Sequence, residues 1–140
     1  MKKLILALVI NIFVNLNYTF AQTITMPSSL TADTTNFVLL SSSGTAPSIN
    51  GFTETDLLAT IVASAGTLIV TTTTGLEQAS GYCDYTADNS SEPTNCKLGA
   101  SDHPEIGFIG TQAEINTALA TLSFKGDGST GSPTVTLSIT

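Results

Sequence analysis

The chain has 140 residues, a formal net charge of −7 and no arginine, which excludes the clustered basic surfaces that bind nucleic acid or anionic lipid. Thr and Ser are abundant, Trp is absent, and Gly and Pro recur as turn formers, as is typical of an extracellular all-β module. Divalent cations, neutral glycans and other proteins remain as partner classes.

The N-terminus has the three parts of a secretory signal peptide. Two lysines precede an apolar run over residues 4–14, and Thr19 and Ala21 place small side chains before a cut that follows Ala21. The run is shorter than the roughly 20 apolar residues that span a bilayer, although a retained N-terminal anchor is the alternative. Removal of residues 1–21 leaves two lysines against eleven acidic residues, a net charge of −9. We expect a secreted or bacterial cell-surface protein, extracellular or periplasmic.

The mature chain reads as one domain of short strands. Residues 22–31 are a lead-in segment or weak edge strand, and the domain itself occupies residues 32–140. A first firm strand is expected over 37–40. Two longer apolar stretches, 57–64 and 67–73, are separated by a two-residue turn and favour a β-hairpin.

Residues 77–104 form a long polar excursion, which is followed by a strand over 105–109. A final strand over 134–140 alternates apolar and polar residues, and its apolar members share one face. Those members are Val135, Leu137 and Ile139.

One short helix is predicted near the C-terminus, between the strands at 105–109 and 122–124. Thr111 and Glu114 have the spacing of a capping box. The apolar residues that follow recur at helical spacing on one face, with Asn116 at its margin and Gln112 on the exposed side. Those apolar residues are Ile115, Ala118, Leu119 and Leu122. A helix this short is marginal alone in water, so we expect it to lie against a sheet.

The order of these motifs resembles the cadherin-like, immunoglobulin-like tandem repeats of large bacterial surface adhesins. The similarity covers about residues 31–140, and its most specific part is the Gly-Thr-x-x-x-Ile-Asn segment within 109–124. Weaker matches are the acidic turns at 32–34 and 54–56 and the glycine motifs at 65–68 and 74–76. The resemblance implies an all-β, Ig/cadherin-like β-sandwich with one short helix inserted between strands near the C-terminus. Two departures are Glu54 in place of the first Asp of the acidic turn, and a cysteine-containing loop in place of a shorter, cysteine-free connection.

Asp33, Glu54 and Asp56 are the best metal candidates. Calcium takes hard oxygen ligands from turns, and acidic turns at the end of a module can stiffen it. A site between two repeats would be only half-built in a single module. The alternative is that these carboxylates are solvated or cap their own turns.

Cys83 and Cys96 are the only cysteines, and we expect a disulfide between them in an exported chain. The bridge would close a loop of twelve intervening residues, worth roughly 3 kcal/mol in the chain-entropy model. Their spacing matches no zinc or redox pattern.

The same loop contains further candidates for chemistry. Tyr82 and Tyr85 flank Cys83 and could stack on a sugar or a partner surface, or else pack over the base of the loop. His103 follows an aspartate, but no Gly-x-Ser-x-Gly motif accompanies it. A second acidic set near the two cysteines matches no EF-hand spacing and favours solvated positions. Its members are Asp84, Asp88, Asp102 and Glu105.

These observations favour an exported, non-enzymatic module for adhesion or structural spacing in a bacterial cell-surface protein, with calcium as its one candidate cofactor. Its partners would be a protein or glycan on another surface, or neighbouring repeats. The alternative is a soluble glycan- or protein-binding module acting through the loop at 77–104. A hydrolase is a more distant third reading, because no motif supports one.

Overall fold

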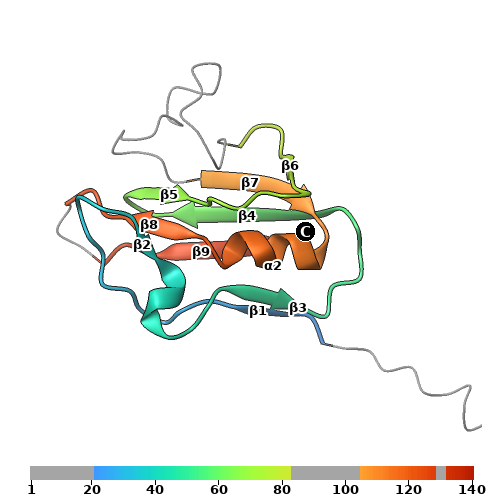
Figure 1. Cartoon of the computed structure of the whole chain (residues 1–140), viewed down its shortest axis with the longest axis horizontal. Coiled ribbons are helices and arrows are strands. Elements are labelled where there is room, and N and C mark those ends of the chain that lie inside the picture. Colours follow the sequence, from blue (N-terminus) through green and yellow to red (C-terminus); the bar gives the residue numbers. More distant parts are fainter. Residues whose placement is uncertain (1–20, 83–104, 129–131) are drawn as a thin grey trace, which may run out of the picture.

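A computed structural model describes residues 21–82, 105–128 and 132–140. Its strands form three antiparallel sheets, and one short α-helix lies near the C-terminus, so the expected mostly-β architecture is confirmed (Figure 1). Within these ranges no helix is long and apolar enough to cross a membrane. The bounds are β1 Thr23–Thr25, β2 Val38–Leu39, the 3-10 helix η1 Leu40–Ser43, β3 Ser48–Asn50, β4 Leu57–Ala63, β5 Thr67–Ile69, β6 Glu77–Gln78, β7 Glu105–Gly110, α2 Gln112–Leu119, β8 Ser123–Lys125 and β9 Val135–Ile139.

The sheets have the strand orders β1-β3, β2-β8-β5 and β6-β7-β4-β9. Pairing of β1 with β3 confirms a weak edge strand in the lead-in segment. The expected strand at 37–40 is shorter than predicted, because η1 begins at Leu40 and that side chain is buried in the core. The predicted strands at 105–109 and 134–140 are present as β7 and β9.

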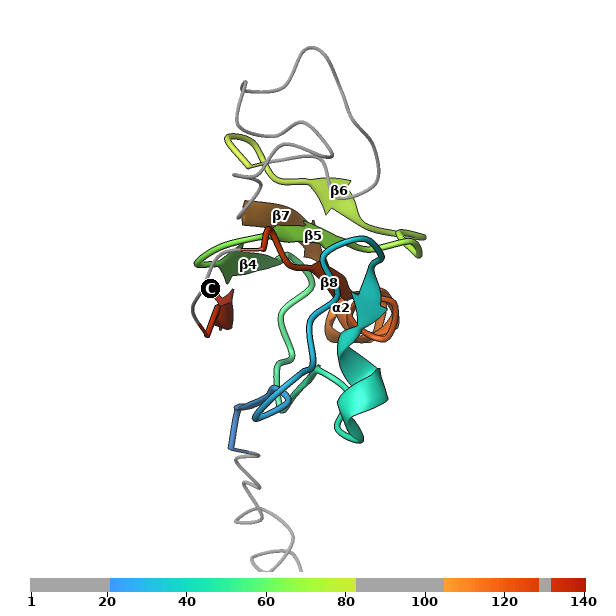
Figure 2. The ribbon, with the colours of Figure 1, turned by 90° about the vertical axis from the view of Figure 1, so that its left-hand side faces the viewer.

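The strand β4 is the centre of the largest sheet. Its side chains alternate between the core and the outer face, and Ile61 lies opposite Ile106 on one side and Leu137 on the other. Figure 2 shows α2 and η1 on one side of this sheet. The alternation of period two therefore fixes which face of β4 is buried.

The predicted hairpin between 57–64 and 67–73 is wrong. β4 pairs with β7 and β9, so both of its edges are occupied, and β5 pairs instead with β8 in the other sheet. The turn between them crosses from one sheet to the other. Gly66 has φ +91°, and a Cβ there would collide with the Phe124 ring and the Lys125 carbonyl, so the crossing requires glycine.

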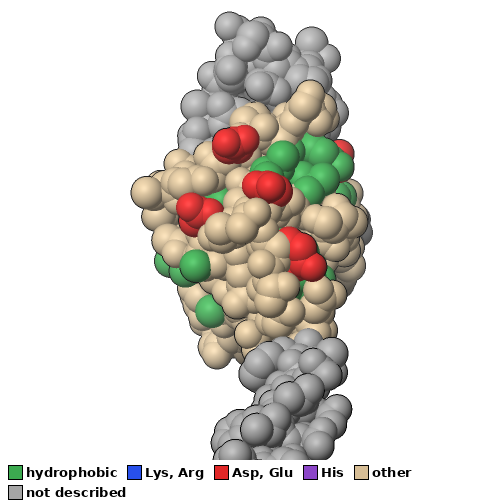
Figure 3. Space-filling view, turned by 90° about the vertical axis from the view of Figure 1, so that its right-hand side faces the viewer, with side chains coloured by type: hydrophobic (Ala, Val, Ile, Leu, Met, Phe, Trp, Pro, Cys, Tyr) green, Lys and Arg blue, Asp and Glu red, His purple; other side chains and the backbone are tan. Residues whose placement is uncertain are grey.

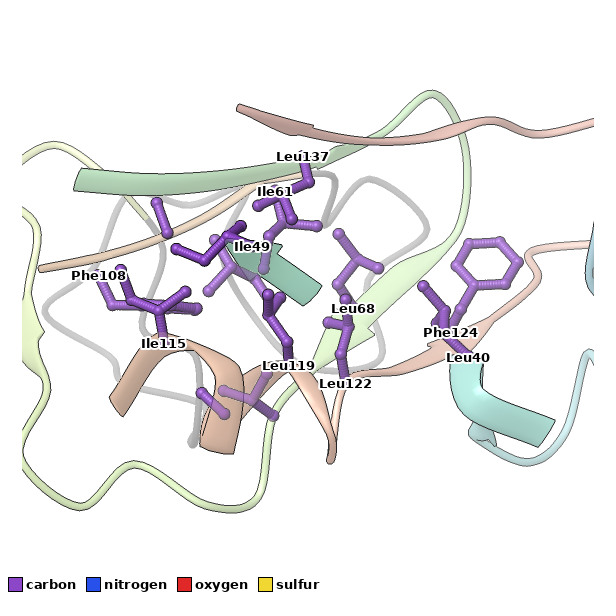
Figure 4. Packing of buried hydrophobic residues seen from close by; sticks show 14 of the residues in the cluster. Leu40, Ile49, Ile61, Leu68, Phe108, Ile115, Leu119, Leu122, Phe124 and Leu137 are labelled. Atoms are coloured by element: carbon purple, nitrogen blue, oxygen red, sulfur yellow. The ribbon is translucent and has the colours of Figure 1, made fainter. Parts of the chain in front are cut away.

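One hydrophobic core joins these elements. Side chains from β4, β7 and β9 meet side chains from β3, β5, β8, η1 and α2 (Figure 4). The labelled residues of that view are Leu40, Ile49, Ile61, Leu68, Phe108, Ile115, Leu119, Leu122, Phe124 and Leu137. Residues far apart in sequence thus share one core, which is why the short helix is stable.

The helix α2 is capped as predicted. Glu114 N–H donates to Thr111 Oγ1 at 3.4 Å, and the Glu114 carboxylate accepts from the Thr111 amide at 2.8 Å. Its predicted apolar face is buried throughout, including Leu119 at 0% exposure. The exposed position expected for Gln112 is wrong, because its Oε1 accepts a hydrogen bond from the Phe52 amide at 2.9 Å in a half-buried position.

Candidate functional site

One end of the four-stranded sheet carries several acidic side chains. β4 begins where β7 ends, and β6 begins beside that end of β7. Glu54 and Asp56 lie in the turn before β4, Glu77 begins β6, and Glu114 lies in the first turn of the helix that follows β7. Figure 3 shows acidic side chains spread over this side of the molecule, next to a hydrophobic patch. This end of the sheet is the most acidic surface that the placed residues form, and Lys125, the one basic residue among them, lies at the other end of the fold.

Glu114 takes part in this surface but is already engaged. Its Oε2 accepts from both the amide and the hydroxyl of Thr111, at 2.8 and 2.7 Å. These hydrogen bonds stabilise the ionised form and lower the pKa of Glu114. The carboxylate also lies where a Cβ on Gly75 would have to be, and Gly75 has φ +84°. The glycine of the Thr-Gly-Leu motif is therefore needed for close packing against the helix cap.

Asp33 caps its own turn. Its Oδ1 accepts from the amide and the hydroxyl of Thr35, both at 2.7 Å, and its Oδ2 accepts from the Asn36 side-chain amide at 3.1 Å. The amide and hydroxyl of Thr35, with support from Asn36, hold the pKa of Asp33 well below its ordinary value. The alternative reading of this residue, a local cap, is the one that the geometry favours.

The three predicted calcium ligands do not come together. The Asp33 carbonyl accepts from the Gly126 amide beside the end of β8, whereas Glu54 and Asp56 precede the start of β4. β8 pairs with β5 next to the end of β4, so the two places are separated by the length of β4, roughly 20 Å for seven residues. Among the described side chains, no group of three or more His, Cys, Asp or Glu residues could hold one metal ion together.

The cap at Asp33 predicts an acid-dependent contribution to stability. Its pKa is depressed in the folded state, so the stabilisation is present above the ordinary carboxylate pKa of about 4 and is lost as the pH falls below it. We expect Asp33→Ala to lower the urea midpoint at pH 7, and we expect its difference from wild type to shrink progressively as the pH falls below about 4. Thr34→Ala, an uncharged exposed neighbour, should follow the pH dependence of wild type. Parallel curves for Asp33→Ala and wild type would contradict this assignment.

Tyr82 lies over the outer face of the large sheet. Its ring occupies the space above Gly107 in β7, where any Cβ would collide with it. The backbone around it is also held, because its amide donates to the Ala79 carbonyl and its own carbonyl accepts from the Gln78 side chain at 3.1 Å. The geometry thus supports packing over the base of the loop. Binding of a partner by Tyr82 stays a prediction.

The remaining loop candidates lie outside the described residues, except Glu105, which begins β7 opposite Val62. Those outside are Cys83, Asp84, Tyr85, Asp88, Cys96, Asp102 and His103. Their predicted roles, the disulfide above all, are unchanged by the structure.

The disulfide has a direct test. If Cys83 and Cys96 are bonded, reductant should lower the melting temperature of the purified chain, because the unfolded state regains the entropy of the opened loop. A bridge near the roughly 3 kcal/mol expected from chain entropy would shift Tm by roughly 10–15 °C in a domain of this size. Two free thiols by mass, or an unchanged Tm, would contradict the bond.

Sequence reasoning missed an apolar groove between the lead-in segment and the start of β9. The groove has a volume of about 600 Å³, and its lining combines the core residues Leu40 and Phe124 with partly buried Met26, Leu30 and Val135. Serine, proline, alanine and threonine residues form the rest of the lining. The only sequence signal was the pair Met26 and Leu30 in an otherwise polar lead-in.

Known proteins offer no further assignment. No protein-family model, no curated protein and no solved structure matches this chain.

Proposed function

We propose that this chain is an exported, non-enzymatic module of a bacterial cell-surface protein, with an Ig/cadherin-like β-sandwich fold, and that it serves adhesion or structural spacing. The observation that carries the proposal is the crossing at Gly66. It leads the chain from the centre of one sheet into a second sheet over the same core. Layered sheets joined by such crossings are the general plan of β-sandwich modules.

The polar groups at the turns support a structural role. The two described carboxylates with a lowered pKa, Asp33 and Glu114, accept hydrogen bonds from the backbone of a turn or a helix cap. Their charge is used to stabilise the ends of elements rather than to meet a substrate. A spacer or adhesion module needs this kind of stiff, well-capped scaffold.

The proposal includes a calcium site for which a single module supplies only part of the ligand set. Glu54 and Asp56 would supply oxygen ligands from one module, and a neighbouring repeat would supply the others. Calorimetry on two copies joined in tandem should then detect calcium binding that the single chain lacks. Asp56→Ala in the tandem protein should weaken it at least tenfold, whereas Asp33→Ala should not. Equal affinity in the two variants would remove Asp56 from the site.

The proposed role can be tested with the secreted chain on beads. We expect such beads to adhere to cell surfaces or matrix proteins, or a tandem array to resist force as a chain of separately unfolding modules. In single-molecule pulling, each event should release up to roughly 400 Å of chain for 119 residues at about 3.4 Å each. The proposal would be overturned if the beads did not adhere and the tandem array did not resist force.

A second candidate function is glycan or protein binding through the loop at 77–104. The observation that favours it is the packing of the Tyr82 ring on Gly107, which anchors the start of the loop to the outer face of the sheet. Binding on a glycan array that is lost with Tyr85→Ala, while the melting temperature stays that of wild type, would support this candidate. Binding unaffected by Tyr85→Ala would count against it.

A further inference from the structure

The strand β9 presents an open edge. It is the last strand of the order β6-β7-β4-β9 and pairs only with β4 among the described elements. In Figure 2, continuing the line of the four strands past β9 leads to open space and to no other described element. Among the described residues, this sheet therefore ends on a strand whose second side has no pairing partner.

The backbone groups on that side follow from the register. Leu58 and Thr140 exchange both of their backbone hydrogen bonds, and the Ser64 amide donates to the Thr134 carbonyl. Because bonding alternates along an antiparallel pair, every second residue of β9 faces β4 and the residues between face outward. The outward amides and carbonyls belong to Val135, Leu137 and Ile139.

Within its five residues β9 has no charge, proline or bulge to protect its edge, and the nearest proline is Pro133, two residues before it. Residues 134–140 contain no charged residue and no proline, and β9 forms a continuous ladder with β4 over its whole length. Proteins usually blunt a free edge with lysine, proline, an inward charge or a bulge. An unprotected, neutral edge is suited to addition of another strand.

We propose that β9 pairs antiparallel with β9 of a second copy of this chain, forming a continuous eight-stranded sheet across a two-fold axis at Leu137. The absence of charge on β9 argues against a charged peptide as the occupant. The mature chain has a net charge of −9, so two copies repel each other over most surfaces, and β9 offers a contact with no charge on either side. An acidic or basic peptide would find no complementary charge on this strand.

The two-fold register would also place a side chain of the second copy over the apolar groove between the lead-in segment and the start of β9. Centring the pair on Leu137 sets Val135 opposite Ile139 of the second copy, with both side chains on the core-facing side. Val135 lines the groove beside Met26 and Leu30. Ile139 of the second copy would therefore cover the groove, and symmetry would cover the other groove in the same way. Each copy thus contributes a residue to the apolar site of the other.

Sedimentation of the secreted chain over a concentration series tests this interface. We expect a reversible dimer, and we expect Ile139→Lys to weaken it at least tenfold under conditions where circular dichroism shows the variant to be folded, since Ile139 also packs against the core of its own copy. Ser138→Lys is the matched control, because it adds the same charge on the same strand but on the exposed outer face. A monomer at all concentrations, or equal effects of the two variants, would overturn the proposal.

Cross-linking tests the register independently of the stability of either variant. Thr136 and Ser138 of opposite copies would face each other at a close, non-hydrogen-bonded pair. A mixture of Thr136→Cys and Ser138→Cys chains should form mixed disulfide dimers, and each variant alone should form several-fold fewer. Dimers that cross-link equally in all three samples would contradict the two-fold pairing.

Discussion

Leu119→Ala should lower the free energy of unfolding by about 2–5 kcal/mol, the usual range for removing a core leucine. Leu119 is 0% exposed and lies on the buried face of α2 together with Ile115 and Ala118. The helix has only eight residues, so it depends on this face for its stability. The lost contacts would leave a cavity between the helix and the sheets, which the surrounding strands could close only in part.

Two further variants of the same helix calibrate this result. Thr111→Ala removes the side chain that caps the helix and should cost about 1 kcal/mol. Thr117→Ala is the matched control, because Thr117 is exposed and its hydroxyl bonds only to the Ala113 carbonyl one turn earlier. That change should stay within about 0.5 kcal/mol of wild type. Urea unfolding would measure all three, and equal effects of Leu119→Ala and Thr117→Ala would show that the helix is not packed as described.

Local signals in the sequence predicted this helix well. The capping residues Thr111 and Glu114 are three positions apart, and the buried residues recur at spacings of three and four. Each signal lies within about one or two turns, so it needs no knowledge of distant partners. The same is true of the alternation in β9, where Leu137 is buried and its neighbours Thr136 and Ser138 are exposed.

Pairings between distant segments were less predictable. A two-residue turn between apolar runs favours a hairpin, yet Leu68 pairs with Phe124, 56 positions away, because the edges of β4 are taken by β7 and β9. Strands compete for the free edges of other strands, and no local sequence pattern indicates which strand will occupy a given edge. Gly66 was a turn signal in either case, and only the surroundings show that it serves a crossing between sheets.

The three predicted calcium ligands lie apart for a related reason. Asp33 and Asp56 both lie in acidic turns close to the start of a strand, and sequence order alone suggests that such turns meet at one end of a module. The structure places them at opposite ends of β4, and the carboxylate of Asp33 is engaged by Thr35. A residue type suited to calcium is equally suited to capping a turn, so composition could not decide between the two.

Asn116 shows the limit of prediction most clearly. Its place at the margin of the buried face followed from helical spacing, but its partner did not. Its Oδ1 accepts from the Ile49 amide at 2.8 Å, and its Nδ2 donates to the Ile49 carbonyl at 2.9 Å. Ile49 is 67 positions away and 1% exposed. The side-chain amide thus acts as a neighbouring strand would, satisfying both backbone groups of Ile49 on the side of β3 that faces the helix.

Asn116→Ala should therefore cost about 2–4 kcal/mol, because it leaves a donor and an acceptor without partners and each such buried group costs about 1–3 kcal/mol. Asn50→Ala, at the exposed end of the same strand, should be nearly neutral and serves as the control. Hydrogen exchange adds a specific readout, since the Ile49 amide should lose its protection in Asn116→Ala and keep it in Asn50→Ala. Retained protection at Ile49 would mean that another group satisfies this amide, and the link between helix and strand would then have to be assigned elsewhere.

Asn116→Asp separates the two hydrogen bonds, because the carboxylate still accepts from the Ile49 amide but has no donor for the Ile49 carbonyl. We expect that variant to keep the amide protected and yet to unfold at lower urea than wild type, since its charge would face the Ile49 carbonyl across the former hydrogen bond.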